Sequence, residues 1–421
     1  MDATGTPLLL SRRFAPLFWC QFFAAFNDNF LKTALVFLIL FRGHPGADAL
    51  ITTASAIFIA PYFVLSGLGG ELADRYDKAR VAQVVKFIEM AVAGVAVWGY
   101  AQESLPVLFA ALFGFGVLAS LFGPMKYGIL PDHLPRERLP AANALIEGAT
   151  FIAILAGTIV GGVAAHRGGA FGFAPMVIAF SLACWIAALL IPPSGEGEPQ
   201  LAVRANIAAS TFAMLRHLRA DARLWWGALV TSWFWLTGIV VLSLLPPLIK
   251  NLIGGDEATV TAYLALFTVA VGAGSALAAR LARGRIVLGI TVVGAALIGV
   301  FAVDLGLATL GLAPATVLQA PQAALGSTAG LRVAIDLCGL ALAGGLFIVP
   351  AFAAVQAWSD VAYRARTIAG VNVLNAGFMT AGTVVVALLQ KQGVTLPWLF
   401  IGLGAMTLGV AALVAKTKPK P

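Results

Sequence analysis

Residues 70–80 decide the fold, and they read Gly70-Glu71-Leu72-Ala73-Asp74-Arg75-Tyr76-Asp77-Lys78-Ala79-Arg80. This run of acids and bases lies between two apolar stretches, at about 49–70 and 80–101. A stretch of roughly 20 apolar residues is long enough to cross a bilayer as a helix. We therefore interpret residues 70–80 as a tight loop that joins two transmembrane helices.

The composition of the whole chain supports a membrane protein. Of its 421 residues, 60% are hydrophobic and 11% are charged, and the mean hydropathy is +0.93. These values exclude a soluble globular protein. The formal net charge of +8 does not indicate nucleic-acid binding, because the basic residues lie in short loops between apolar runs and form no contiguous stripe.

Working outward from residues 70–80, a window of about 20 residues predicts twelve spans and therefore an all-α membrane protein. Their approximate limits are 14–41, 49–70, 80–101, 105–128, 140–165, 171–191, 224–250, 257–281, 285–311, 331–358, 365–390 and 395–415. The connection between the ninth and tenth spans is apolar enough to form a short interfacial helix.

The longest polar interruption predicts three parts: a six-helix bundle at 1–191, a linker at 192–223 with a basic amphipathic segment, and a second six-helix bundle at 224–421. A faint internal repeat supports two halves, because Asn143, Leu145 and Gly148 have the same spacing as Asn372, Leu374 and Gly377.

The distribution of basic residues predicts the orientation. With both termini in the cytoplasm, most of the 27 Lys and Arg residues fall on the cytoplasmic side, as the positive-inside rule requires. The opposite side keeps only Arg42, Arg167, Lys250, Arg332 and Lys391. Lys32 lies inside the first span.

That first span contains the polar run Asn27-Asp28-Asn29 followed by Lys32. An ionisable side chain at the centre of a membrane helix costs about 3 kcal/mol on insertion scales, so it usually faces a polar interior or a substrate path. Asp28 and Lys32 are four residues apart and lie on one helical face. They either line a transport pathway or neutralise each other inside the bundle.

Residues 70–80 resemble the signature loop between helices 2 and 3 of the major facilitator superfamily, with a glycine four residues before Asp-Arg. The resemblance implies two six-helix bundles that latch on the cytoplasmic side during alternating access. The implied latch residues are Gly70, Asp74, Arg75, Lys78 and Arg80. Asp77 stands where that family usually has glycine, and the loop at about 280–285 lacks a second acidic copy, so the latch is predicted to be one-sided. A solvated turn is the alternative.

A narrower resemblance covers most of the chain. The first-span motif, the run 126–131, the run 143–148 and Arg364-Ala365-Arg366 followed by Asn372 and Asn375 resemble the bacterial lysophospholipid transporter family. The resemblance implies a flippase of the cytoplasmic (inner) membrane. It would move lysophosphatidylethanolamine or lysophosphatidylglycerol from the outer to the inner leaflet for reacylation by an acyltransferase.

Chemical motifs for catalysis are missing from the sequence. There is no phosphate-binding loop, no nucleophile elbow, no acyltransferase His and Asp spacing and no metal-ligand spacing. We therefore expect no enzyme activity, no catalytic residue, no metal and no cofactor. Cys20, Cys184 and Cys338 are far apart in the sequence and are interpreted as packing residues without a nearby partner.

A lysophospholipid carrier must shield a charged head group. Asp28 can meet an ethanolamine ammonium and Lys32 its phosphate, with Asn27 and Asn29 beside them. Glu147, with Asn143 one turn earlier, forms a second polar station or a gate, or its carboxylate is satisfied by a neighbouring helix. Asn372 and Asn375 line the cavity or bond across helices. A proton-coupled exporter of drugs or small metabolites is the alternative function. The segment at 201–223 lies on anionic lipid or docks a separate acyltransferase.

Overall fold

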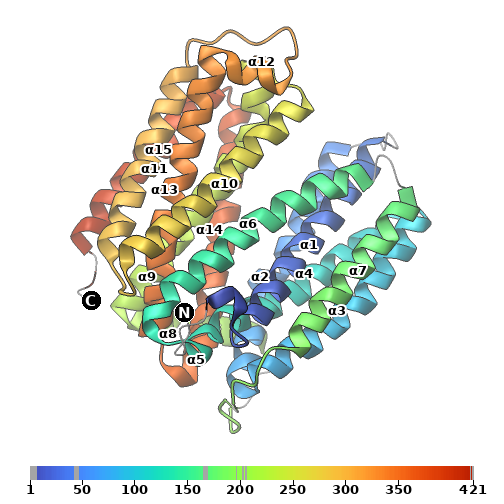
Figure 1. Ribbon diagram of the computed structural model, residues 1–421, viewed down its shortest axis with the longest axis vertical. Helices are drawn as coiled ribbons and strands as arrows, with labels where there is room; N and C mark the ends of the chain where they lie inside the picture. Colours follow the sequence, from blue (N-terminus) through green and yellow to red (C-terminus); the bar gives the residue numbers. More distant parts are fainter. Residues whose placement is uncertain are drawn as a thin grey trace. The chain divides into compact units, whose positions relative to one another are not determined.

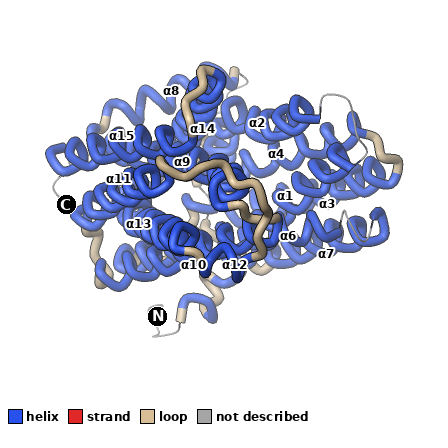
Figure 2. Tube along the Cα trace, turned by 90° about the horizontal axis from the view of Figure 1, so that it is seen from above, coloured by secondary structure: helices blue, strands red, loops and turns tan. Residues whose placement is uncertain are grey.

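The protein is described by a computed structural model that covers residues 7–41, 47–164, 169–195, 197–201, 203, 206–417 and 419. Arg42 and Arg167, which entered the predicted orientation, lie outside the described residues. Helices joined by short loops account for almost all of this part of the chain (Figure 2), and one isolated bridge joins Gly255 and Gln319.

Twelve helices of 21 residues or more correspond to the twelve predicted spans within the described part. They are α1 (Ala15–Phe41), α2 (Ala47–Arg75), α3 (Lys78–Ala101), α4 (Leu105–Gly128), α6 (Leu139–Val163), α7 (Gly169–Leu189), α9 (Ala222–Leu248), α10 (Glu257–Ala282), α11 (Leu288–Thr309), α13 (Thr328–Trp358), α14 (Arg364–Lys391) and α15 (Leu396–Thr417). The short helices are α5 (Leu130–His133), α8 (Ile207–Ala220) and α12 (Pro321–Gly326). The fold class predicted from hydropathy is confirmed.

Eleven helices in the described part are long and apolar enough to cross a membrane. The helix outside this set is α1, whose apolar sequence is interrupted by Asn27, Asp28, Asn29 and Lys32. The short helix α12 lies in the connection where the sequence suggested an interfacial helix. The basic linker segment forms α8, and Asn206 caps its start by accepting a hydrogen bond from the backbone N–H of Ala209.

The chain forms two compact units. Unit 1 comprises Met1–Ala142, Ala149–Leu224 and Gln356–Ala376, and unit 2 comprises Asn143–Gly148, Trp225–Val355 and Gly377–Pro421. The first turns of α14 therefore belong with the N-terminal helices, and a short piece of α6 belongs with the C-terminal ones. The division into bundles at 1–191 and 224–421 follows the sequence order and stays a prediction.

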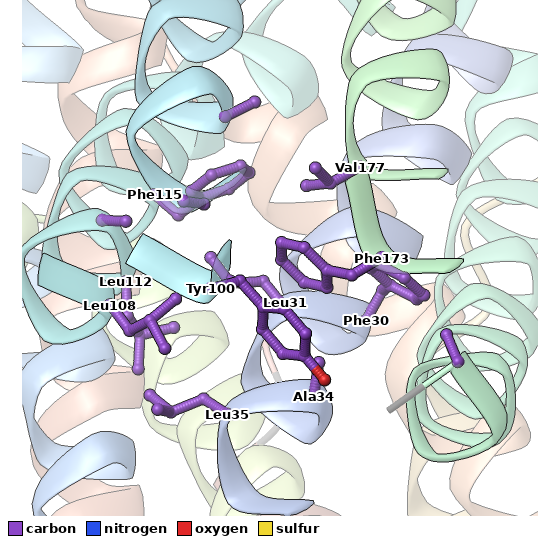
Figure 3. Close-up of a cluster of buried hydrophobic side chains, with 14 of the residues drawn as sticks. Phe30, Leu31, Ala34, Leu35, Tyr100, Leu108, Leu112, Phe115, Phe173 and Val177 are labelled. Atoms are coloured by element: carbon purple, nitrogen blue, oxygen red, sulfur yellow. The ribbon is translucent and has the colours of Figure 1, made fainter. Parts of the chain in front are cut away.

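In unit 1, helices α1, α2, α3, α4 and α7 lie side by side (Figure 1). Their shared core is aromatic: the rings of Tyr100 and Phe173 stack at 4.2 Å, and the rings of Phe30 and Phe173 stack at 5.5 Å (Figure 3). All three side chains are at most 5% exposed. This packing fixes α1 against α7 and so sets the direction in which the polar residues of α1 point.

Close approach between α6 and α1 depends on a glycine. A Cβ at Gly157 would collide with the carbonyl oxygen of Phe26, so only glycine lets the two backbones come this near. In unit 2, α11 and α15 make a similar contact at Gly299 and Gly404, where a Cβ on Gly404 would lie 2.7 Å from the carbonyl oxygen of Gly299. Small residues at helix interfaces are the usual means of close packing in membranes.

Candidate functional site

The polar residues of α1 fall into two groups. Asp28 and Lys32 are half-buried, and no hydrogen bond or ion pair to either side chain is found among the described residues. In this part of the chain the two side chains make no direct ion pair, although they interact electrostatically, so lining a pathway and neutralising each other both stay predictions. Asp28 is nevertheless close enough to interact electrostatically with Glu89, Lys86, Lys126 and Lys32. A cluster of five charged side chains thus lies within unit 1.

Within this cluster, Lys86 and Glu89 of α3 pair with each other. Their Nζ and Oε2 atoms are 2.5 Å apart, and the side chains are 1% and 2% exposed. The ammonium of Lys86 also lies 4.3 Å from the ring centroid of Phe122 on α4. Buried charges are usually paired in this way, and the i, i+3 spacing brings Lys86 and Glu89 together on one face of α3. Asp28, Lys32 and Lys126 are the half-buried charges of the cluster.

The amides of Asn27 and Asn29 are bonded to other parts of the protein and not to the charged cluster. Asn27 is fully buried and donates hydrogen bonds to the hydroxyl of Ser181 at 2.8 Å and the carbonyl of Val177 at 3.3 Å, both on α7. Asn29 donates to the carbonyl of Ala25 one turn earlier, at 2.8 Å. Both amides of α1 therefore have structural partners, and Asn27 serves the packing of α1 on α7.

The remaining predicted site residues belong to different parts of the structure. Asn143 and Glu147 are fully buried one turn apart on α6 and belong to unit 2. Asn372 and Asn375 lie in the part of α14 that belongs to unit 1. The amide nitrogen of Asn372 would lie 3.1 Å from a Cβ at Gly123, so it lies against α4. Unit 1 therefore places Asn372 against α4, whereas Asn143 and Glu147 belong to unit 2.

The second site is the start of α14. Asp74, which is 2% exposed, accepts hydrogen bonds from the backbone N–H groups of Ala365 at 2.9 Å and Arg366 at 3.0 Å. It also accepts one from Nε of Arg366 at 2.8 Å. The first N–H groups of a helix lack partners within the helix and carry its positive end, so a carboxylate there is stabilised by both effects.

A second carboxylate reinforces this contact. Asp132 of α5 lies 2.9 Å from Nζ of Lys78 and 2.7 Å from Nη1 of Arg364. Gln356 adds a hydrogen bond from Nε2 to the carbonyl of Tyr127 at 3.1 Å. The charges alternate in sign from Lys78 to Asp132 to Arg364. The start of α14 is therefore held by two carboxylates, Asp74 and Asp132. We call Asp74, Lys78, Asp132, Arg364 and Arg366 the latch cluster.

The linker at 194–201, which we call the strap, holds the turn between α2 and α3. Asp77 accepts hydrogen bonds from the backbone N–H groups of Arg80 at 3.1 Å, Ser194 at 2.9 Å and Gly195 at 3.0 Å. Asp77 therefore caps α3 and fixes the first residues of the strap. The residue that departs from the family pattern thus has a definite structural task.

Further bonds continue along the strap. The N–H of Glu198 donates to the carbonyl of Asp74 at 2.7 Å, and Nη1 of Arg75 donates to the carbonyl of Leu201 at 2.8 Å. The carboxylate of Glu198 lies 2.9 Å from Nη2 of Arg366. The strap is thereby joined to the latch cluster through one of its arginines.

Helix α8 packs on this region through one face. Ser210, Met214 and Leu218, at intervals of four residues, are at most 2% exposed. The hydroxyl of Ser210 donates to the carboxylate of Glu71 on α2. The opposite face of α8 leaves Phe212 68% exposed.

Sequence reasoning missed several of these partners. Asp132 and Glu198 were not singled out, although an acid just beyond the run 126–131 was a usable signal. The interpretation that Cys20 has no nearby partner is wrong, because its Sγ lies 3.7 Å from Sγ of Cys184 in the core between α1 and α7. An ion pair of 2.7 Å between Arg332 and Asp304 in unit 2 was also not foreseen.

Comparisons with known proteins place the chain among transporters. The family model described as Major Facilitator Superfamily matches residues 17–335. The chain is 32% identical over 283 residues to the "Lysophospholipid transporter LplT" of Yersinia pestis (strain Pestoides F), which covers 66% of this chain and 67% of that protein. The same values are found for the protein of that name from Yersinia pseudotuberculosis serotype I (strain IP32953).

Solved structures share the fold at low sequence identity. The human organic anion transporter MFSD10 (TETRAN) matches with a TM-score of 0.73 at 15% identity, covering 96% of this chain and 98% of that chain. The proton:xylose symporter XylE matches with a TM-score of 0.73 at 13% identity, covering 97% and 96%. A bacterial homologue of the iron transporter ferroportin matches with a TM-score of 0.68 at 18% identity, covering 97% and 100%. These likenesses concern the fold alone.

Proposed function

Because this chain belongs to the major facilitator superfamily and to its LplT-like members, we propose that it is a lysophospholipid flippase. It moves lysophosphatidylethanolamine or lysophosphatidylglycerol from the outer to the inner leaflet of a bacterial cytoplasmic membrane. One observation carries this proposal: Asp28 and Lys32 are half-buried on a membrane helix without a hydrogen bond or ion pair among the described residues. Charges left in this state inside a membrane usually serve a substrate path.

Asp28 and Lys32 suit the two charges of a zwitterionic head group. The carboxylate of Asp28 binds the ammonium of ethanolamine, and the ammonium of Lys32 binds the phosphate, each by a charge-assisted hydrogen bond. Lys86 and Glu89 keep each other neutral nearby, so they add a polar wall without competing for the head group. Asn27 is left out of this contact because its amide is bonded to α7.

Asn143 and Glu147 are assigned to a second polar station in unit 2, and Asn372 and Asn375 to the part of the pathway formed by α14. All four are amides or carboxylates on membrane-spanning helices, where polar groups usually face a protein interior. They offer hydrogen bonds to a head group that has left Asp28. The single acyl chain is accommodated by the apolar helix surfaces around these stations.

The latch cluster supplies the conformational part of the cycle. Asp74 and Asp132 hold the first turn of α14 through Arg364 and Arg366. Release of these bonds frees α14, and through it unit 2, to move during alternating access. Gly70 permits the closed contact, since a Cβ there would lie 2.7 Å from Cβ of Ala369 on α14.

The membrane orientation follows from the positive-inside rule, with both termini and the latch cluster in the cytoplasm. The exposed face of α8 carries Arg216, Arg219 and Phe212. A basic face with an exposed aromatic side chain suits an anionic membrane surface, on which an acyltransferase that consumes the product can also dock.

The decisive experiment follows leaflet exchange in vesicles that contain the purified protein. Labelled lysophosphatidylethanolamine, lysophosphatidylglycerol and a diacyl phospholipid are compared with and without a proton gradient. We expect movement of both lysolipids and none of the diacyl lipid. Exchange of small cationic drugs alone, driven by the gradient, would replace this proposal by the proton-coupled exporter.

Variants connect the activity to Asp28. Asp28→Asn removes the charge that binds the ammonium, and a hydrogen bond to a charged group is worth roughly 1.5–3 kcal/mol. Transport of the ethanolamine lipid should therefore fall about 10- to 150-fold, and transport of the glycerol lipid much less. Asp221→Asn, the same change at a linker residue paired with Arg223, serves as the matched control. Equal losses for both lipids would remove Asp28 from head-group recognition.

A further inference from the structure

A groove of about 910 Å³ lies in unit 1, apart from Asp28 and Lys32. It is formed by the end of α2, the first half of α3, a stretch of α4 and the linker. Its lining is Leu72, Arg75, Tyr76, Asp77, Ala79, Arg80, Val81, Gln83, Val84, Val85, Ile88, Leu118, Leu121, Pro193, Gly195 and Pro199. The volume lies within the usual range of sites that bury a small amphiphilic molecule.

One end of the groove is basic, and the one carboxylate among its lining residues, that of Asp77, already accepts hydrogen bonds. Arg80 is exposed, and Arg75 uses Nη1 to bond Leu201 while its guanidinium lies 5.3 Å from the ring centroid of Tyr76. Asp77 accepts three backbone N–H groups, so its carboxylate is already satisfied. The charge that this end offers to a ligand is therefore positive.

The other end of the groove is apolar and lies on membrane-spanning helices. Val84 is 58% exposed and Ile88 is 45% exposed, both on α3. Leu118 and Leu121 of α4 line the groove beside them. The spans Lys78–Ala101 and Leu105–His133 include all four residues, so this end lies on helices that are long and apolar enough to cross a membrane. The groove thus changes from basic to apolar as it passes from the turn at residues 75–80 along α3.

We propose that this groove binds an anionic diacyl phospholipid of the surrounding membrane. The phosphate lies between Arg75 and Arg80, and one acyl chain lies along Val84 and Ile88. Basic pockets between transmembrane helices on the cytoplasmic side are suited to anionic head groups, and arginine matches a phosphate with parallel hydrogen bonds. An apolar floor beside the arginines selects a lipid over a soluble phosphate. This site is separate from the transport pathway.

Occupancy of the groove has a consequence for the latch cluster. Gly195 and Pro199 of the strap line the groove together with the preceding Pro193, and Glu198 of the strap bonds Arg366. A lipid in the groove therefore stabilises the strap in the position where Glu198 holds α14. By reciprocal coupling, the lipid favours the latched state, and the latched state favours the lipid.

Binding is tested on the purified full-length protein in mild detergent, with diacyl phosphatidylglycerol and diacyl phosphatidylcholine as probes. Native mass spectrometry counts bound lipid, and a thermal unfolding assay measures the Tm at each lipid concentration. We expect phosphatidylglycerol to bind and to raise the Tm, and phosphatidylcholine to do so only at about tenfold or higher concentration.

Two substitutions change the side chains at the basic end and at the apolar end of the groove. Arg80→Gln removes a charge from an exposed side chain, and Val84→Trp fills the apolar end with a bulky ring. Each should weaken phosphatidylglycerol binding about tenfold or more. Arg285→Gln, at an exposed arginine of unit 2, is the matched control for general surface charge, and it should bind as the unmodified protein does.

The outcomes separate this site from the transport function. Asp28→Asn should keep phosphatidylglycerol binding even where its transport of lysolipid has fallen. Equal binding by Arg80→Gln, Val84→Trp and the unmodified protein would overturn the proposal, as would equal binding of the two diacyl lipids. The Arg80→Gln result is decisive even if Val84→Trp folds poorly, because Arg80 is exposed and only its backbone N–H bonds Asp77.

Discussion

The substitution Asp74→Asn should release the start of α14. The carboxylate of Asp74 accepts three hydrogen bonds in a site where it is 2% exposed. Asparagine keeps one acceptor oxygen, so the bond to Ala365 can survive, but it loses the oxygen that serves both N–H and Nε of Arg366. The negative charge at the helix N-terminus is lost as well.

The size of the effect follows from these contacts. Breaking a buried ion pair by removing one partner costs about 3–5 kcal/mol, because the other charge is left uncompensated. Arg366 retains Glu198, whose carboxylate lies 2.9 Å away and is half-exposed. We therefore take the lower end, about 3 kcal/mol, which corresponds to about a 150-fold shift from latched to unlatched protein.

Hydrogen exchange measures this shift directly. In the latched protein the amides of Ala365 and Arg366 are bonded to Asp74, and their exchange requires opening. Asp74→Asn should speed the exchange of a peptide spanning 361–371 by up to about 150-fold, whereas Asp221→Asn should leave it unchanged. Arg366→Gln combined with Asp74→Asn should add little to either single change. Unchanged exchange in Asp74→Asn would refute the assignment of this carboxylate to the latch.

Two further predictions test the packing and the strap. Oxidation of the folded protein with membrane-permeant diamide should join Cys20 to Cys184, whose sulfurs are 3.7 Å apart, and should leave Cys338 reduced. Peptide mapping detects the disulfide, with Cys338 as the free-thiol control. Failure to form the disulfide in the folded protein would argue against the packing of α1 on α7. Asp77→Ala should cost about 1 kcal/mol through the lost cap of α3 and should speed protease cleavage at 194–201 several-fold. Unchanged cleavage would show that Asp77 does not hold the strap.

The sequence was sufficient for the fold because bilayer thickness imposes a length on every span. Each of the twelve predicted stretches became a long helix, and the short polar connections became the turns. The polar run in α1 was also readable, because charges within an apolar helix are rare and costly. Local rules of this kind need only neighbouring residues.

Partners distant in the sequence could not be predicted in the same way. Asp132 and Arg364 are 232 positions apart, and Cys20 and Cys184 are 164 apart. Neither pair has a spacing that a periodicity or a motif could reveal. The position of Asn27 beside Asp28 in the sequence suggested a substrate contact. Successive residues of an α-helix point about 100° apart, however, and the amide of Asn27 points toward α7. Asn27 therefore packs α1 on α7, although the adjacent Asp28 belongs to the charged cluster.

The missing acid in the loop at about 280–285 also has an explanation in the latch cluster. The sequence predicted a one-sided latch that included Asp74, and in the latch cluster both carboxylates, Asp74 and Asp132, come from the N-terminal half of the chain. Their partners are the arginines and the helix N-terminus of α14. A helix end provides about half a positive charge without any side chain, so a single segment of α14 can replace a second acidic loop. Asp77 has a φ of −55°, which does not require glycine, and its carboxylate accepts hydrogen bonds from the strap.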